Sequence, residues 1–302
     1  MNDYVLSVLL GIVEGLTEFL PISSTAHLRI VEKLLLPAGW SSGYWKMYTI
    51  VIQLGAILCL PIYFRKRIAQ FLSTFPQGKR GDRNPLTHPL GLVMVGFVVT
   101  AIPSFLMTKL IGKHLESLYI MGTSLLIGGI VMWIVDELNS TSETAGLGAT
   151  GTRIRTWHME DMSLGQAIWI GACQIVSAVF PGTSRSMSTI AAGQIVGLSR
   201  PAALEFSFFL SMPTMAVATL YDLYKTLKPS RDTMVEGGIA PLAVNAHEWI
   251  VLAIGFVVSF IVALAVVAWF MNWVRSRGFV PFSIYRIALG IVLVILLLRG
   301  IL

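Results

Sequence analysis

Charged residues are scarce in this sequence. Only 13% of its 302 residues are Asp, Glu, Lys or Arg, about half the share found in a typical soluble domain. Hydrophobic residues make up 55% of the chain, and the mean hydropathy is +0.75. This composition excludes an ordinary soluble enzyme and predicts an integral membrane protein.

Cysteine is also scarce, because Cys59 and Cys173 are the only two. Both lie inside apolar segments, and their spacing suits neither a zinc site nor a redox CxxC motif. We therefore expect both side chains to be packing residues.

The net charge of +6 would also fit a protein that binds nucleic acid. However, the Lys and Arg residues stand mostly at the ends of apolar runs, where they would meet lipid phosphates. We therefore expect membrane lipids as partners and no nucleic acid.

Long apolar runs without the alternation of a strand predict helices that cross the bilayer. The fold class that follows is an all-α integral membrane protein with six transmembrane helices. The six predicted spans are 47–64, 89–111, 119–138, 202–224, 248–273 and 279–298.

Two further apolar segments, 4–36 and 163–199, are interrupted by PISST and by PGTSRS. Each half is shorter than the roughly 20 apolar residues needed to cross a membrane. Such broken segments are tolerated at membrane depth only where protein or water surrounds the break. We expect two re-entrant helical hairpins.

The sequence contains an internal repeat. In the two interrupted segments, matching residues differ in number by 160 throughout: Gly11 and Gly171, Glu14 and Gln174, Pro21 and Pro181, Ser24 and Ser184. Further along, 51–61 aligns with 203–213, which pairs Gln53 with Glu205, and GFVV at 96–99 recurs at 255–258.

Each copy of the repeat would hold one hairpin and three spans. Because three crossings is an odd number, the second copy must enter from the opposite side, which predicts an inverted-topology repeat. We expect one membrane domain, 1–302, made of repeat 1 (1–138), a flexible Ser/Thr/Gly-rich linker (139–162) and repeat 2 (163–302).

The orientation follows from the basic segment 65–88, which should lie in the cytoplasm. The first hairpin then enters from outside and the second from the cytoplasm, so the two interruptions meet near the midplane. We expect a bacterial inner-membrane protein whose site faces the extracytoplasmic side.

Glu14 and Glu18 are four residues apart and would project from one face of a helix. Two such charges in a low dielectric repel each other unless a cation, a proton or a metal lies between them. The alternative is a carboxyl group that is neutral or paired with an arginine. We favour a functional pair.

Ser23, Ser24 and Thr25 follow the first break directly and would cap the next helix, and we expect Ser23 and Thr25 also to bind the substrate. Capping does not explain His27, which lies in the first turn of that helix. A single histidine is more often structural, but a serine, a histidine and two carboxylates at one break are the set needed to activate a nucleophile.

The second break, PGTSRSMST at 181–189, favours an anion. A glycine permits an unusual turn, backbone N–H groups at a helix start can bind phosphate, and arginine adds a two-point grip. The alternative is capping together with a snorkelling arginine. The candidate residues are Gly182, Thr183, Ser184, Arg185, Ser186 and Thr189.

Gln53, Gln174 and Glu205 are polar groups inside apolar segments. We expect them to hold the side chains that contact the substrate in place, without contacting the substrate themselves. Structural hydrogen bonds between helices would explain them almost as well.

The motif EGLTEFLPISSTAH from Glu14 and the motif PGTSRSMST from Pro181 resemble the two signatures of the bacterial undecaprenyl-diphosphate phosphatases, the bacitracin-resistance family. VIQLGAIL and EFSFFLSMP also occur in the family's order, so the resemblance covers nearly the whole chain. The long linker is the one visible departure.

The resemblance implies a phosphatase that converts the C55 isoprenyl diphosphate to its monophosphate, recycling the lipid carrier for cell-wall glycans, and that needs a divalent cation. The family's functional positions correspond to Glu14, Glu18, Ser24, His27, Ser184, Arg185, Ser186 and Thr189. We expect Glu14 and Glu18 to hold Mg²⁺ or Ca²⁺.

Chemistry favours Ser24 as the nucleophile, with His27 as base and later as acid, and leaves open an attack by His27 itself or by a water that His27 activates. Two other classes of protein compete with the enzyme: a lipid-carrier flippase or ion-coupled transporter of inverted-repeat architecture, and a non-catalytic lipid-binding protein. Ion-coupled transport needs carboxylates but no nucleophile, so we favour the phosphatase. A homodimer is possible.

Overall fold

The computed structural model describes residues 2–35, 42–78, 84–114, 117–145, 156–227 and 245–301. Within these ranges the regular structure is helical, apart from one isolated bridge between Thr156 and Leu198. The predicted all-α class is confirmed.

Six helices in the described part of the chain are long and apolar enough to cross a membrane. A helix of 19 residues is about 28 Å long, close to the thickness of the hydrocarbon core. The six predicted spans are therefore confirmed, and the protein is a multi-pass membrane protein. The helices are α3 (Ser42–Tyr63), α5 (Pro89–His114), α6 (Leu118–Ala145), α9 (Arg200–Leu227), α11 (Ala246–Ser276) and α12 (Val280–Leu298).

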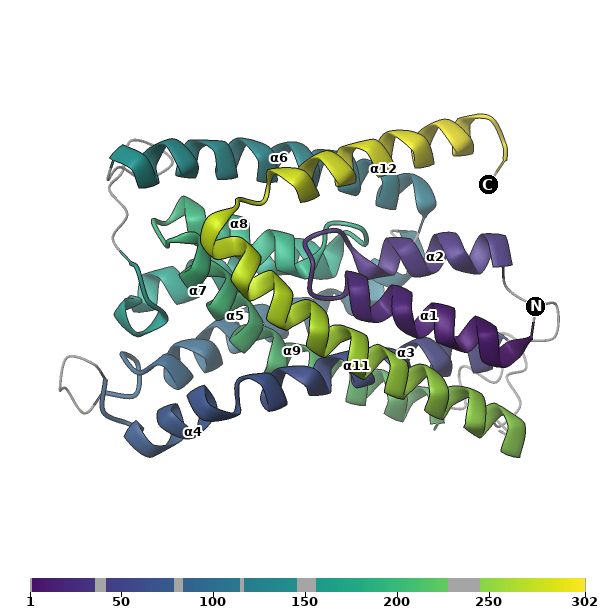
Figure 1. Ribbon diagram of the computed structural model, residues 1–302, viewed down its shortest axis with the longest axis horizontal. Helices are drawn as coiled ribbons and strands as arrows, with labels where there is room; N and C mark the ends of the chain where they lie inside the picture. Colours follow the sequence, from purple (N-terminus) through teal and green to yellow (C-terminus); the bar gives the residue numbers. More distant parts are fainter. Residues whose placement is uncertain are drawn as a thin grey trace.

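Two pairs of shorter helices occupy the interrupted segments. The first pair is α1 (Asp3–Thr17) and α2 (Ser24–Leu35), and the second is α7 (Leu164–Val179) and α8 (Arg185–Ile195). At 1.5 Å per residue, even the longest is only about 24 Å long. Figure 1 shows the two pairs in opposite halves of the molecule, with their connecting turns toward the middle.

The expected linker 139–162 is shorter than predicted, as far as the structure describes it. Helix α6 continues to Ala145, and within it Asp136 is buried and bound by Arg200 and Gln194. At the other end, Thr156 exchanges backbone hydrogen bonds with Gly197 and Ser199, and a short 3-10 helix, η1 (Met159–Asp161), follows. Residues 146–155 lie outside the described ranges.

Glycine allows two close helix crossings that resemble each other. Helix α1 packs along α11, and α7 packs along α5. A Cβ on Gly11 would lie 2.8 Å from the carbonyl oxygen of Gly255, and one on Gly171 would lie 2.5 Å from that of Gly96. Small residues allow such close backbone approach in membrane proteins. The two crossings therefore correspond to each other, because the repeat pairs Gly11 with Gly171 and Gly255 with Gly96.

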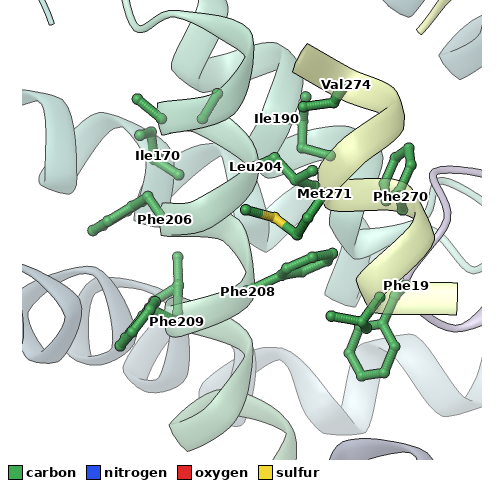
Figure 2. Packing of buried hydrophobic residues seen from close by; sticks show 14 of the residues in the cluster. Phe19, Ile170, Ile190, Leu204, Phe206, Phe208, Phe209, Phe270, Met271 and Val274 are labelled. Carbon is green, nitrogen blue, oxygen red and sulfur yellow. The ribbon is translucent and has the colours of Figure 1, made fainter. Parts of the chain in front are cut away.

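An aromatic core lies behind the turn between α1 and α2. Phe19, in that turn, makes an edge-to-face contact with Phe208 of α9, with 5.5 Å between the ring centroids. Phe208 in turn approaches Phe270 of α11 (Figure 2). Edge-to-face pairs add to the packing energy. This cluster fixes the first turn against α9.

Candidate functional site

Both turns contain a serine in the left-handed backbone region. Ser23 has a φ of 72° and Ser184 a φ of 70°, a conformation that strains a non-glycine residue by about 1–3 kcal/mol. Each serine then caps the next helix, since its Oγ accepts from the backbone N–H three residues on. Ser23 is thus the geometric counterpart of Ser184, so the expected pairing of Ser24 with Ser184 is off by one residue, because the second turn is shorter.

The two glutamates keep the predicted helical spacing. Helix α1 ends at Thr17, but Glu18 retains helical dihedrals and its N–H donates to the Glu14 carbonyl at 2.9 Å. Glu14 is 1% exposed and Glu18 is 7% exposed. Both carboxyl groups are therefore removed from solvent. In the low dielectric of the protein interior, the repulsion between two negative charges is strong.

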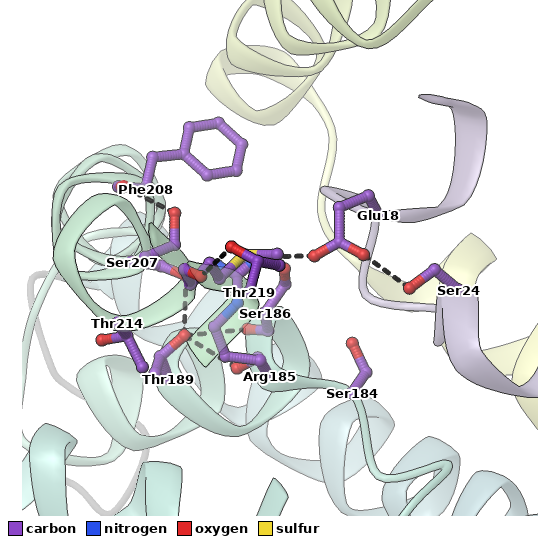
Figure 3. Close-up of polar contacts among 12 residues, drawn as sticks. Glu18, Ser24, Ser184, Arg185, Ser186, Thr189, Ser207, Phe208, Thr214 and Thr219 are labelled. Carbon is purple, nitrogen blue, oxygen red and sulfur yellow. Dashed lines mark hydrogen bonds and ion pairs between the residues drawn. The ribbon is translucent and has the colours of Figure 1, made fainter. Parts of the chain in front are cut away.

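Glu18 connects the two helix pairs. Its Oε2 accepts a 2.6 Å hydrogen bond from Ser24, and its Oε1 accepts a 3.1 Å bond from Nη2 of Arg185 (Figure 3). The Arg185 and Glu18 side chains form a largely buried ion pair. The two sequence motifs, more than a hundred residues apart, therefore meet at one carboxylate.

Several buried polar atoms of this cluster lack a partner among the described residues. They are both carboxylate oxygens of Glu14, Nη1 of Arg185 and Oγ of Ser186. An unsatisfied buried polar group costs about 1–3 kcal/mol, and a charged one costs more. The cluster therefore has free donors and free acceptors for a ligand that carries both signs of charge.

A cavity of about 600 Å³ adjoins the cluster. Its other end lies between α5 and α9, where the wall is mostly apolar. The predicted site residues that line it are Glu18, Ser23, Ser24, Thr25, Gln53, Gln174, Gly182, Ser184 and Arg185.

Among the described residues, His27 makes no hydrogen bond to Ser24 or Glu18. Its Nδ1 donates to the Ser23 carbonyl at 2.7 Å, so Nε2 of a neutral ring accepts the 2.6 Å hydrogen bond from the Tyr285 hydroxyl. The two rings are also stacked, with 5.6 Å between centroids. His27 does not line the cavity, and its ring is held by a residue of α12.

Three predicted substrate-binding residues lie outside the cavity lining. Thr189 is fully buried and shares a 2.6 Å hydrogen bond with Ser207 of α9 (Figure 3). Ser186 is also buried, and the Thr183 carbonyl accepts from Arg286. These residues support the second turn in this structure.

Glu205 lies apart from the cavity, whereas Gln53 and Gln174 line it. Glu205 pairs with Arg67 of α4 (Arg65–Thr74) at 2.8 Å, and Arg67 also binds Glu160 at 2.6 Å. The hydrogen bond that Arg67 donates to Glu160 raises the pKa of Arg67 above its ordinary value. Burial alone would raise the pKa of Glu160, but the hydrogen bonds from Arg67 and from its own backbone, together with the nearby charge of Arg67, outweigh burial and lower that pKa. This network ties α4 to α9.

Two site neighbours escaped the sequence analysis, Tyr285 and Arg286 of α12. Arg286 is fully buried and donates to the carbonyls of Pro21 and Thr183 at 3.0 and 2.8 Å. The signal available in the sequence was a single arginine inside an otherwise apolar span.

Fold and site together define a class: a multi-pass helical membrane protein with a buried arginine, glutamate and serine cluster beside an internal cavity. A family model described as "Bacitracin resistance protein BacA" matches residues 7–292. The chain belongs to this family, as the resemblance of its motifs predicted.

Relatives from several bacteria are similar along their whole length. An undecaprenyl-diphosphatase of Koribacter versatilis is 64% identical over 291 residues, which cover 96% of this chain and 97% of the relative. An undecaprenyl-diphosphatase of Caldanaerobacter subterraneus subsp. tengcongensis is 36% identical over 301 residues, which cover 100% of this chain and 98% of the relative. Undecaprenyl-diphosphatase 2 of Paramagnetospirillum magneticum is 38% identical, with coverages of 97% and 98%.

Proposed function

We propose that this protein hydrolyses undecaprenyl diphosphate to the monophosphate and inorganic phosphate, and so recycles the lipid carrier of cell-wall synthesis. The relatives named above are undecaprenyl-diphosphatases. The observation that carries the proposal is the cavity, because it joins a charged cluster to an apolar passage between two helices.

The substrate has a charged head and an apolar chain, and the cavity has a charged end and an apolar end to match them. Phe97, Ala101 and Phe105 of α5 line the apolar end of the cavity, opposite Met215 and Ala218 of α9. Phe105 is also 63% exposed on the outer surface, which faces lipid in a membrane-spanning helix. A diphosphate head can thus reach the cluster while its isoprenyl chain remains among apolar side chains.

Arg185 is the natural ligand of the diphosphate. Its Nη2 holds Glu18, whereas its buried Nη1 has no partner among the described residues. A guanidinium offers two parallel N–H donors to a phosphate. Nη1 can therefore bind a phosphate oxygen while Nη2 keeps its hydrogen bond to Glu18.

Ser24 is the proposed nucleophile, because its hydroxyl already points at an acceptor. Its Oγ attacks the terminal phosphorus, the bond from that phosphorus to the bridging oxygen breaks, and the proton passes to Glu18 at 2.6 Å. Water then hydrolyses the phosphoserine and releases inorganic phosphate. His27 can act as acid or base in this second step after its bond to Tyr285 opens.

A divalent cation fits the acidic side of the cluster. Both carboxylate oxygens of Glu14 are buried without a partner among the described residues, and Glu18 lies one helical turn further along the chain. Mg²⁺ or Ca²⁺ prefers such oxygen ligands and, when bound, neutralises phosphate charge. Because the described residues contain no group of three potential ligands, the remaining ligands would be phosphate oxygens and water.

An inverted repeat with two re-entrant hairpins is the architecture that we propose. The matched crossings, Gly11 on Gly255 and Gly171 on Gly96, support it. So do the left-handed Ser23 and Ser184 that end the two turns. Units related in this way are common in membrane proteins that bind ligands near the midplane.

We place the protein in the bacterial inner membrane with 65–88 in the cytoplasm. The apolar end of the cavity lies toward the ends of α5 and α9 that are distant from this basic segment (Figure 1). This arrangement supports a site that opens to the extracytoplasmic side. A homodimer remains a prediction, which a mass measurement in detergent would test.

The test is release of inorganic phosphate from undecaprenyl diphosphate by the purified protein in detergent, with and without a chelator. We expect turnover that stops with the chelator and resumes when Mg²⁺ or Ca²⁺ is restored. A Ser24→Ala variant serves as the background control. Release no faster than in that variant would contradict the proposed function.

A further inference from the structure

Arg286 joins the two turns of the site from behind. It lies within α12, is 0% exposed, and donates to four carbonyl oxygens. One belongs to Pro21 in the first turn, at 3.0 Å. Two belong to Gly182 and Thr183 in the second turn, at 3.3 and 2.8 Å. The fourth belongs to Ser124 of α6, at 3.3 Å.

We propose that Arg286 is a positioning residue for the phosphate: it holds the carbonyls of the second turn away from the cavity, so that the opposite backbone N–H groups face the terminal phosphate. This inference rests on the proposed function, because it assigns a role within the same site. In this role the backbone N–H groups of 184–186 also bind the anion, and Arg286 orients that backbone.

The geometry of the peptide bond supports this role. In a trans peptide the C=O and the next N–H point in opposite directions. Because the Thr183 carbonyl is directed at Arg286, the N–H of Ser184 is directed away from it, and Ser184 lines the cavity. That N–H has no acceptor among the described residues.

The start of α8 supplies further free donors. Arg185 and Ser186 are the first two residues of this helix, whose N–H groups have no partner within the helix. Free N–H groups at a helix start bind phosphate. Independent signs of a missing ligand are the buried, unpartnered Nη1 of Arg185 and Oγ of Ser186.

The charge of Arg286 also argues against a purely structural link. No ion pair between Arg286 and a carboxylate occurs among the described residues, and its Nε has no partner. Burying an unpaired charge is costly, so neutral donors would tie the carbonyls together at lower cost. A fixed positive charge behind an anion site, by contrast, stabilises negative charge in a low dielectric.

Helix α6 offers a way to move the guanidinium without removing it. A Cβ on Gly128 would collide with Nη2 of Arg286 and with the flexible end of the Met187 side chain on α8, and Gly128 does not line the cavity. Gly128→Ala therefore displaces Arg286, and Arg286→Lys keeps the charge while losing the fork that reaches several carbonyls. Gly165→Ala on α7 is the matched control, since a Cβ there meets nothing within 4 Å.

Two measurements test the proposal. One is kcat and KM with undecaprenyl diphosphate in detergent, and the other is calorimetric binding of inorganic pyrophosphate. Arg286→Lys and Gly128→Ala should each lower kcat about tenfold or more, which is roughly 1.4 kcal/mol. Each should also weaken pyrophosphate binding several-fold, with elution and melting close to wild type. Gly165→Ala should match wild type in both.

Failure of this proposal is distinguishable from failure of the proposed function. Wild-type protein that binds pyrophosphate but releases no phosphate from the lipid would contradict the proposed function only. Variants with wild-type kcat and wild-type pyrophosphate affinity would overturn the role of Arg286. Variants whose only defect is a smaller folded fraction would also overturn that role. A wild-type protein that does not bind pyrophosphate would overturn it too.

Discussion

The Ser24 hydroxyl donates to Glu18 at 2.6 Å, while the His27 ring is bound to Ser23 and Tyr285. From the sequence, His27 was the expected base for Ser24. In the structure the group in place to accept the serine proton is Glu18. The two glutamates of the first motif therefore have different environments, since Glu18 has two partners and Glu14 has none among the described residues.

This difference predicts distinct losses in Glu14→Gln and Glu18→Gln. Each change keeps the shape of the side chain and removes its charge. Glu14→Gln removes a cation ligand, so activity should fall about tenfold or more at limiting Mg²⁺ and recover in part at high Mg²⁺. Glu18→Gln removes the proton acceptor, so its larger loss should not recover.

The measurement is phosphate release as a function of Mg²⁺ concentration. Glu137→Gln, at an exposed acid on α6, is the control and should behave as wild type. Identical Mg²⁺ dependence in the two site variants would remove the distinction drawn between Glu14 and Glu18.

Arg185→Lys should lower activity about tenfold or more, roughly 1.4 kcal/mol. Lysine keeps the positive charge but cannot hold Glu18 and a phosphate oxygen with two fixed donors. Steady-state kinetics in detergent measure the loss, and Arg277→Lys at the exposed end of α11 is the control. An unchanged rate would mean that the phosphate is bound elsewhere.

Tyr285→Phe should move the acid limb of the pH–rate profile to higher pH. The Tyr285 hydroxyl donates to Nε2 of His27, which favours the neutral ring. Without that donor the ring is protonated more readily, so a step that needs neutral His27 fails at a higher pH. Tyr119→Phe, which removes a hydroxyl bonded to another residue of α12, should leave the profile unchanged. An unshifted limb in Tyr285→Phe would separate His27 from the rate-limiting step.

The elements were predictable because their signals are local. Hydropathy and length were sufficient for the six spans, and a Pro followed by small hydroxyl residues marked both breaks. The spacing of Glu14 and Glu18 needed only the helical period. Even the meeting of the two motifs followed from counting crossings, since that argument uses only the order of the elements.

The contacts of α12 were not predictable in the same way. Arg286 lies 265 residues after Pro21 along the chain, and nothing local in the sequence shows that the two meet. Glu205 illustrates the reverse case. The repeat pairs it with Gln53, yet the residues 65–74 form a helix that brings Arg67 to Glu205. A repeat predicts backbone equivalence, but side-chain partners depend on the local surroundings of each copy.

The orientation of the protein in the membrane is the last prediction. Lys33 on α2 and Gln77 after α4 are exposed, and the helices α2 and α4 lie on opposite sides of the molecule (Figure 1). In a background with Cys59→Ala and Cys173→Ala, Lys33→Cys should react with an impermeant maleimide in intact spheroplasts. Gln77→Cys should react only after lysis, because it lies in the basic segment assigned to the cytoplasm.

The reverse labelling pattern would place the apolar end of the cavity on the cytoplasmic side, and the diphosphate would then be hydrolysed after crossing the membrane. It would leave the inverted repeat untouched, because that inference depends on the odd number of crossings in each unit. Reaction of both cysteines in intact spheroplasts would instead contradict the number of spans between them. Since α3 is the one long helix between Lys33 and Gln77, this pair tests a single crossing and its direction together.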